Sequence, residues 1–191
     1  LMLSVILLAL ACSAPTPNRN AAETGKVLVL DDFENESSLE SWDGPASIST
    51  EKVAHGGSAL HLDLSDRTRR RLVSETLPSD WSGYEVLRFD IFSSGASVNV
   101  GGMQIYDELG SDEDAEAHGQ SYRGSKLFLN PGWNRFEFML EEAMVEEGNR
   151  PLELSAIRRL VLTFGGGLGE IYLDNVRLPS GPAPESSAGN T

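Results

Sequence analysis

The sequence predicts an all-β domain built as a β-sandwich. Two segments, 58–64 and 86–92, alternate strictly between apolar and polar residues, which is the pattern of a strand with one buried face. The chain contains 19 glycines and 9 prolines and almost no long amphipathic run. Many short strands separated by turn residues, without long helices between them, are typical of a sandwich.

The expected strands follow one another at short intervals, at 26–30, 58–64, 86–92, 98–107, 122–129, 133–140, 159–164 and 170–178. Turn signals rich in Gly, Pro, Asn and Ser separate several of them. In the third strand we expect Leu87, Phe89 and Ile91 to face inward, with Arg88 and Asp90 outward. Only segment 141–147 is expected to be helical, and it is barely two turns long.

Residues 1–12 are expected to be an export signal. Ten of the first eleven residues are apolar, yet a helix of that length spans only about 17 Å, against roughly 30 Å for a hydrocarbon core. Residues 9–12 are similar to a bacterial lipobox, so we expect Cys12 to be lipidated and to anchor the chain in the cell envelope. The alternative is a plain signal peptide with an incidental cysteine.

The remaining chain divides into three parts. Residues 13–25 are polar and contain proline, as expected for a flexible tether, and residues 179–191 have the Pro/Ser/Gly-rich composition of a disordered tail. Between them, residues 26–178 form one domain without a detectable internal repeat. A total of 191 residues suits this single-domain organisation.

Charge and cysteine content exclude several classes of protein. Lys and Arg total 15 against 29 Asp and Glu, a net charge of −14, which opposes binding to nucleic-acid phosphates. One cysteine excludes an internal disulfide framework and a cysteine zinc cage. The three histidines lack the paired spacing of a zinc-hydrolase helix.

Common catalytic motifs are absent. The run from His55 to Ser58 lacks the glycine that a nucleophile elbow needs two residues after its serine. The glycine-rich segment 165–169 leads into a strand and so offers no helix N-terminus for a phosphate. Five carboxylates in 108–118 favour a solvated loop. We therefore expect no enzyme; if the chain were one, His61, Asp63 and Tyr106 would be the residues of interest.

Five motifs, in order, resemble the galactose-binding-domain-like carbohydrate-binding modules. They are the run 31–34 followed by Trp42, then 54–60, 77–84, 130–134 and 172–178. The resemblance is greatest to two groups, the family 11-type glucan-binding modules and the complex I intermediate-associated protein domain. The resemblance implies a jelly-roll β-sandwich of two antiparallel sheets, a glycan groove on the concave sheet and a structural calcium.

The implied calcium would join the first and last strands. Glu34 and Asp174 are the expected carboxylate ligands, with Asp32 as a third. Calcium takes 6–8 oxygen ligands, so backbone carbonyls near Ser58 would have to complete the shell. The alternative is that these acids are ordinary turn residues.

A candidate glycan platform follows from alternation. Sugar rings need an aromatic plane for stacking and polar groups for their hydroxyls. We expect segment 98–107 to pair with 86–92, so that one face presents both kinds of group. The candidate residues are Arg88, Asp90 and Gln104 as polar contacts, and Tyr106 with either Tyr122 or Trp42 as stacking rings. The alternative is an ordinary solvated sheet face.

The function expected from the sequence is non-catalytic binding of a polysaccharide or oligosaccharide by a monomeric lipoprotein. Its place would be the bacterial outer membrane, on the periplasmic or surface side, with contact to the membrane through the lipid anchor only. Two alternatives stay open. One is an assembly lipoprotein that uses a sandwich face for protein contact, and the other is a jelly-roll polysaccharide lyase or hydrolase.

Overall fold

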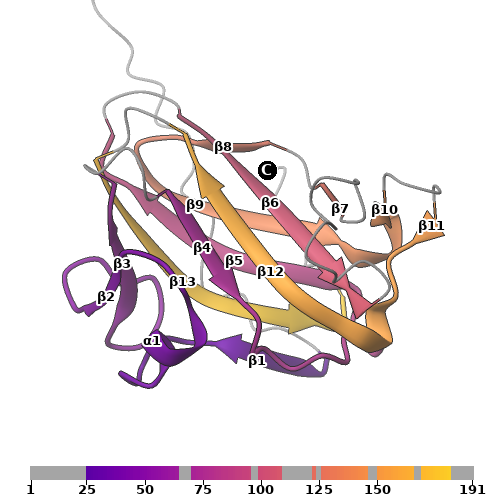
Figure 1. The fold of residues 1–191 in the computed structure, drawn as a ribbon. Helices are drawn as coiled ribbons and strands as arrows, with labels where there is room; N and C mark the ends of the chain where they lie inside the picture. Colours follow the sequence, from indigo (N-terminus) through magenta and orange to yellow (C-terminus); the bar gives the residue numbers. More distant parts are fainter. Residues whose placement is uncertain are drawn as a thin grey trace, which may run out of the picture.

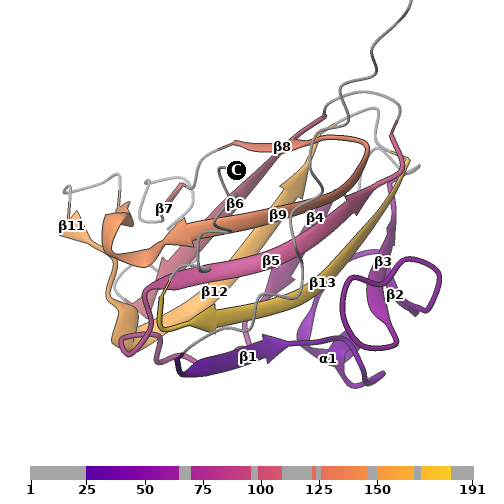
Figure 2. The same cartoon turned by 180° about the vertical axis from the view of Figure 1, so that it is seen from behind.

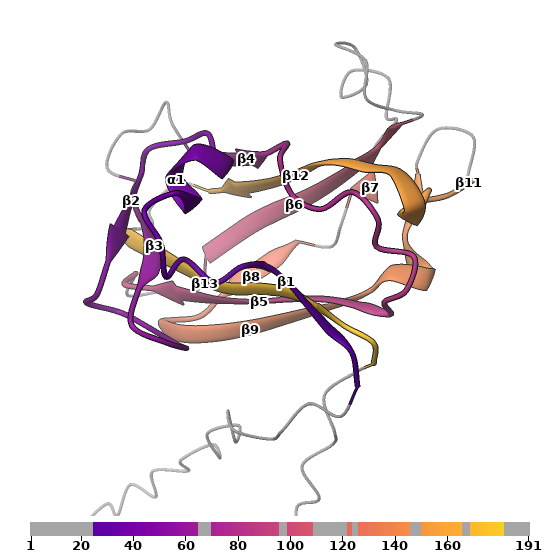
Figure 3. The same cartoon turned by 90° about the horizontal axis from the view of Figure 1, so that it is seen from below.

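The computed structural model describes residues 25–64, 70–95, 99–108, 122–123, 126–145, 150–165 and 169–181. These residues form two antiparallel sheets that face each other, as the view from below, edge-on to the sheets, shows (Figure 3). The predicted all-β jelly-roll sandwich is thereby confirmed. Cys12, the segment 1–24 and the carboxylate-rich run 109–118 lie outside the described residues.

Sheet A has six strands and carries the first and last strands of the domain (Figure 2). Its order is β2-β3-β13-β5-β9, and β1 also pairs with β13. Its strands are β1 (Val27–Asp31), β2 (Ala46–Ser49), β3 (Ala59–Asp63), β5 (Val86–Ser93), β9 (Gly132–Met139) and β13 (Glu170–Pro179).

Sheet B has five strands and lies in front in Figure 1. Its order is β4-β12-β6-β7, with β8 also paired to β6. Its strands are β4 (Arg71–Ser74), β6 (Asn99–Asp107), β7 (Tyr122–Arg123), β8 (Leu127–Leu129) and β12 (Ile157–Phe164). A small hairpin of β10 (Met144–Val145) and β11 (Arg150–Pro151) stands beside it.

The core fills the space between the sheets. The inward residues predicted for β5, Leu87, Phe89 and Ile91, are fully buried there, as are Leu60 and Leu62 of β3. Sheet B contributes its own inward set, Leu72, Met103, Ile105, Leu160 and Leu162. Strict alternation on both sheets therefore leaves two outer faces, one per sheet, as the candidate binding surfaces.

Strand β13 is the central strand of sheet A, because it pairs with β1, β3 and β5. Its register shifts between Asp174 and Arg177, and Asn175 adopts a left-handed backbone with φ of 57°. Asn is among the residues that tolerate this conformation best. The bulge divides β13 into one half that pairs with β3 and another that pairs with β1.

The turn after β1 is organised by the carboxylate of Asp31. Its oxygens accept hydrogen bonds from the Phe33 backbone N–H (2.9 Å), the Ser38 hydroxyl (2.7 Å) and the Trp42 indole N–H (3.0 Å). Phe33 and Trp42 are both in the core, and Phe33 has a left-handed φ of 59°. One acid thus fixes the turn, the start of α1 (Ser38–Ser41) and a core indole.

We expect Asp31→Ala to lower the free energy of unfolding by about 2 kcal/mol, because it leaves the Trp42 indole N–H and the Ser38 hydroxyl without their acceptor. Urea unfolding of this variant measures the loss. Asp32→Ala is the matched control. Asp32 is exposed and, within the described part of the chain, accepts a hydrogen bond only from the Glu34 N–H. Equal stability of both variants would contradict the assigned role of Asp31.

Several short elements differ from the sequence expectation. The helix predicted at 141–147 is wrong: a 3-10 turn at Leu140–Glu142 leads into β10 instead. The buried residues Leu140, Ala143 and Val145 do not follow a helical spacing, and Leu152 N–H bonds the Ala143 carbonyl to begin the hairpin. The predicted strand 122–129 is divided into β7 and β8, and α1, β2, β4, β10 and β11 were not predicted.

Candidate functional site

The predicted binding residues do not form one platform. Strand β5 pairs with β13 and β9 in sheet A, whereas β6 belongs to sheet B. The expected pairing of segments 86–92 and 98–107 is therefore wrong. Arg88 and Asp90 lie on the outer face of sheet A, and Gln104 and Tyr106 lie on the outer face of sheet B, across the sandwich.

Two of the predicted stacking rings are buried. Tyr106 has no exposed surface; it packs with Val161, and the Arg159 guanidinium lies 5.3 Å from its ring centre. Trp42 is 3% exposed and packs against Phe33 in the core. Neither ring has an open face for a sugar. Tyr122 begins β7, and its side chain is not among the described ones.

The outer face of sheet A instead presents a row of four rings, which we call the aromatic row. His61, Tyr172, Phe92 and Trp133 are direct cross-strand neighbours on β3, β13, β5 and β9. His61 stacks on Tyr172 at 4.6 Å between ring centres, and Phe92 makes edge contacts with Tyr172 and Trp133. Four adjacent strands give the row a length of about 14 Å. Tyr172 is buried, but the other three rings are partly exposed.

Charged side chains continue this face next to the aromatic row. Arg135 Nε donates to Asp90 Oδ1 at 3.1 Å, and His55 Nε2 lies 3.7 Å from Asp90 Oδ2. One step further along the strands, Arg88 Nε lies 2.8 Å from Glu137 Oε1. Burial lowers the pKa of the Arg88 guanidinium, while Glu137 acts in the opposite direction.

This charged area keeps unused hydrogen-bonding capacity. Among the described residues no group accepts a hydrogen bond from Arg135 Nη2, and none donates one to Asp90 Oδ2. Both atoms are buried from solvent. An unsatisfied buried polar atom costs about 1–3 kcal/mol, so a turn of these side chains toward the hydroxyl groups of a ligand would recover part of that free energy.

A loop at 50–58 contacts the two middle rings of the aromatic row. Glu51 accepts a hydrogen bond from the Tyr172 hydroxyl at 3.2 Å, and Lys52 Nζ lies 5.5 Å from the Phe92 ring centre. Burial and the nearby carboxylates of Glu170 and Glu51 raise the pKa of Tyr172, so its hydroxyl stays protonated and donates to Glu51. At the two ends of the row, His61 and Trp133 are partly exposed.

The same loop is held by two of the predicted calcium ligands. Glu34 accepts from the Gly57 and Ser58 N–H groups, and Asp174 Oδ2 accepts from the Ala54 and His55 N–H groups at 2.7 and 2.9 Å. The pKa of Asp174 is raised to about 6, mainly by burial and also by the charges of Asp90 and Glu34, against the effect of these two backbone N–H groups.

The fit of calcium to these residues rests on one atom. Asp174 Oδ1 is buried and has no hydrogen-bond partner among the described residues, which suits an oxygen reserved for a cation. Asp32, however, is exposed and turned to the Glu34 N–H. Within the described part of the chain no three His, Cys, Asp or Glu side chains gather as a metal site. A calcium ion here would need Glu34, Asp174 and several backbone carbonyls.

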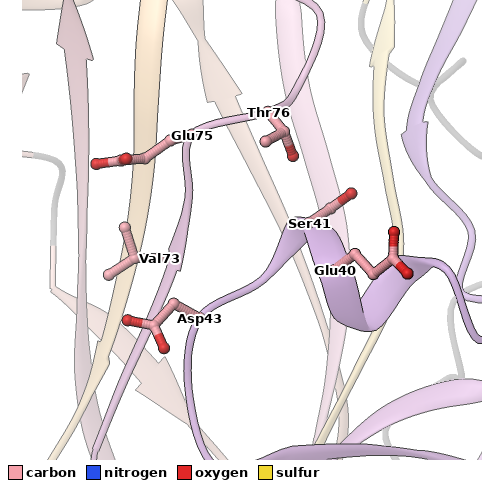
Figure 4. Close-up of a pocket in the computed structure, with 6 residues that line it drawn as sticks. All are labelled: Glu40, Ser41, Asp43, Val73, Glu75 and Thr76. Carbon is pink, nitrogen blue, oxygen red and sulfur yellow. The ribbon is translucent and has the colours of Figure 1, made fainter.

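An acidic pocket of about 240 Å³ lies elsewhere, between α1 and β4. Figure 4 shows Glu40, Asp43 and Glu75 around it, together with Ser41, Val73 and Thr76. Glu75 is engaged by Arg159 at 2.7 Å. The pocket contains none of the residues predicted for binding, and it offers no aromatic ring for a sugar.

The residues singled out for an enzyme do not converge. His61 and Asp63 lie on β3 of sheet A, whereas Tyr106 is buried on sheet B. His61 Nε2 instead lies 3.6 Å from Glu170 Oε1, on the neighbouring strand. No helix in the described ranges is long and apolar enough to cross a membrane.

Comparison with known proteins supports the fold. No protein-family model matches the chain, and no curated protein matches its sequence. Among solved structures, a family 11 carbohydrate-binding module from Clostridium thermocellum, in complex with a β-1,3-1,4-mixed-linked tetrasaccharide, has a TM-score of 0.57 and 18% sequence identity. The match covers 85% of this chain and 100% of that module.

A second group of similar structures contains enzymes. An exo-β-agarase has a TM-score of 0.62 and 19% identity, over 81% of this chain but only 25% of the agarase. Another agarase has a TM-score of 0.57 and 19% identity, over 84% of this chain and 25% of that chain. At these identities the likeness establishes the jelly-roll fold of carbohydrate-binding modules.

Proposed function

We propose that this protein binds a polysaccharide without cleaving it, on the outer face of sheet A. The observation that carries the proposal is the aromatic row, whose open rings lie beside the charged pair Asp90–Arg135. Rings cover the apolar faces of sugars, and charged groups bond the hydroxyls at their edges. The structural likeness to family 11 carbohydrate-binding modules supports the same conclusion.

Each group would have a distinct part in binding. Trp133, partly exposed and held in edge-to-face contact by Phe92, would support the sugar rings. Arg135 Nη2 would donate to a hydroxyl or ring oxygen, and Asp90 Oδ2 would accept from a hydroxyl. Because Asp90 and Arg135 already fix each other, little side-chain entropy is lost on binding.

We expect Trp133→Ala to weaken glycan binding at least about tenfold, because it removes a partly exposed ring at the β9 end of the row. Affinity electrophoresis in gels containing mixed-linkage β-glucan, agarose or other polysaccharides identifies the ligand and measures the loss. Phe128→Ala is the matched control, since Phe128 is an aromatic residue of β8, 58% exposed. Full affinity of Trp133→Ala, with an unchanged melting temperature, would exclude this face.

The proposal includes attachment to the cell envelope through lipidated Cys12. Two acyl chains give stable anchoring where one gives only marginal binding. Mass spectrometry of the protein purified from membranes should show a diacylated N-terminal Cys12, and an unmodified cysteine would contradict it. Calcium held by Glu34 and Asp174 is likewise proposed, as a tie between the loop at 50–58 and the domain ends.

A further inference from the structure

A groove of about 380 Å³ lies along β9, at the edge of sheet A beside β8. We call it the β9 groove. Lys126, Phe136, Phe138 and Glu142 line it, and so do Arg135 and Glu137 of the outer face. Figure 2 shows β9 and β8 next to each other on this side of the sandwich. The groove is therefore continuous with the charged area of the proposed glycan site.

The aromatic row leads a long ligand toward the edge of the sheet. Glu51 and Lys52 lie at the two middle rings of the row, Tyr172 and Phe92. A chain of sugars that stacks on Trp133, the ring of the row on the edge strand β9, extends from there past Trp133. That direction crosses β9, the last strand of the sheet, and reaches the groove.

The groove has the chemistry to hold additional sugar units. Phe136 and Phe138 lie nearly parallel, with ring centres 6.4 Å apart and both partly exposed. Lys126 and Glu142 are exposed and form no ion pair within the described part of the chain. Arg135 lies between the two areas, with Nε bound to Asp90 and Nη2 without an acceptor.

We propose that the β9 groove is a second subsite, which binds the continuation of the same polysaccharide chain as it passes over the edge of the sheet. The inference rests on the proposed function. Lys126 donates to hydroxyl or ring oxygens of these sugars, Glu142 accepts from their hydroxyls, and the edges of the two phenylalanines contact their apolar faces. The protein thereby prefers long chains to short oligosaccharides.

A length comparison tests this subsite. Calorimetric titration of the full chain would use the β-1,3-1,4-mixed-linked tetrasaccharide and the mixed-linkage glucan polymer as probes. The double variant Lys126→Ala/Glu142→Ala should weaken binding of the polymer about fivefold, equivalent to one hydrogen bond of roughly 1 kcal/mol, and leave the tetrasaccharide unchanged. Arg158→Ala/Glu108→Ala, which removes an exposed ion pair of sheet B, should change neither affinity.

The outcomes separate this inference from the proposed function. Unchanged polymer affinity in the double variant would overturn the subsite, while a loss with Trp133→Ala would leave the main site standing. An equal loss for both probes would place Lys126 and Glu142 in the main site and would also overturn the inference. If the unaltered chain binds neither probe, the subsite is rejected, and the polysaccharide panel decides separately on the proposed function.

Discussion

Replacing Arg150 with alanine should lower the free energy of unfolding by about 3 kcal/mol. Its guanidinium holds both oxygens of Asp107, with Nη1–Oδ2 at 2.5 Å and Nη2–Oδ1 at 2.8 Å. Asp107 is fully buried, so the variant removes a two-point ion pair from a buried carboxylate, and breaking a buried pair typically costs about 3–5 kcal/mol. The low end applies because the Arg150 side chain is itself 29% exposed and Asp107 keeps the Glu153 N–H.

Urea unfolding measures this loss, and two further variants identify its cause. Arg158→Ala removes an ion pair with Glu108 in which both side chains are more than half exposed, so it should have little effect. Asp107→Asn combined with Arg150→Ala removes the stranded charge and should recover part of the stability. Equal losses in Arg150→Ala and Arg158→Ala would show that the Asp107 pair is not a structural tie.

The second large effect concerns Asp174 in calcium-free buffer. Its pKa is raised to about 6 in the folded protein, against about 3.9 in an unfolded chain. Between about pH 4 and pH 6 Asp174 is protonated in the folded state but not in the unfolded state. The stability gained from this proton is therefore complete below about pH 4 and is lost as the pH rises through 6. A difference of two pKa units corresponds to about 3 kcal/mol in the free energy of unfolding.

Asp174→Asn should remove this dependence, because Asn carries no charge and its carbonyl oxygen can still accept from the Ala54 and His55 N–H groups. With a chelator present, we expect the variant to be more stable than the unaltered chain at pH 7 and similar to it at pH 4. Thermal unfolding across this range measures the difference, with Asp32→Asn as the control. A constant difference from pH 4 to pH 7 would contradict the assignment.

Calcium should narrow the difference between the two proteins at pH 7 if the proposed site is correct. With an affinity of about 0.1–1 mM, millimolar calcium would stabilise the unaltered chain by about 0.4–1.4 kcal/mol and leave Asp174→Asn unchanged. If calcium stabilised both proteins equally, Asp174 would not be a calcium ligand. The pH dependence measured in chelator does not depend on this result.

The fold was predictable because alternation is a local signal. Leu87, Phe89 and Ile91 of β5 identify their buried face without knowledge of any partner strand. Short elements such as β2 and β4 were missed, since four residues carry too little pattern to stand out. The small hairpin was mistaken for a helix because its two strands have only two residues each, too few to show alternation.

The site was less predictable because strand neighbours are not local. Consecutive strands β5 and β6 lie in different sheets, so adjacency in sequence gave a false platform. A usable signal was nevertheless present. Phe92 shares its alternation with Arg88 and Asp90, Trp133 with Arg135 and Glu137, and Tyr172 with Asp174. Aromatic residues at the polar positions of three strands indicate a ring-bearing outer face.

The central place of the last strand has a consequence for how the chain is made. Until residues 170–179 leave the ribosome, β1, β3 and β5 lack the neighbour that joins them, so sheet A cannot be completed before then. Contacts between the two ends of a domain are also slow to form, because loop closure precedes them. A chain that folds only after this strand is complete stays unfolded until then, as passage through a membrane requires. Such passage is what the N-terminal segment predicts.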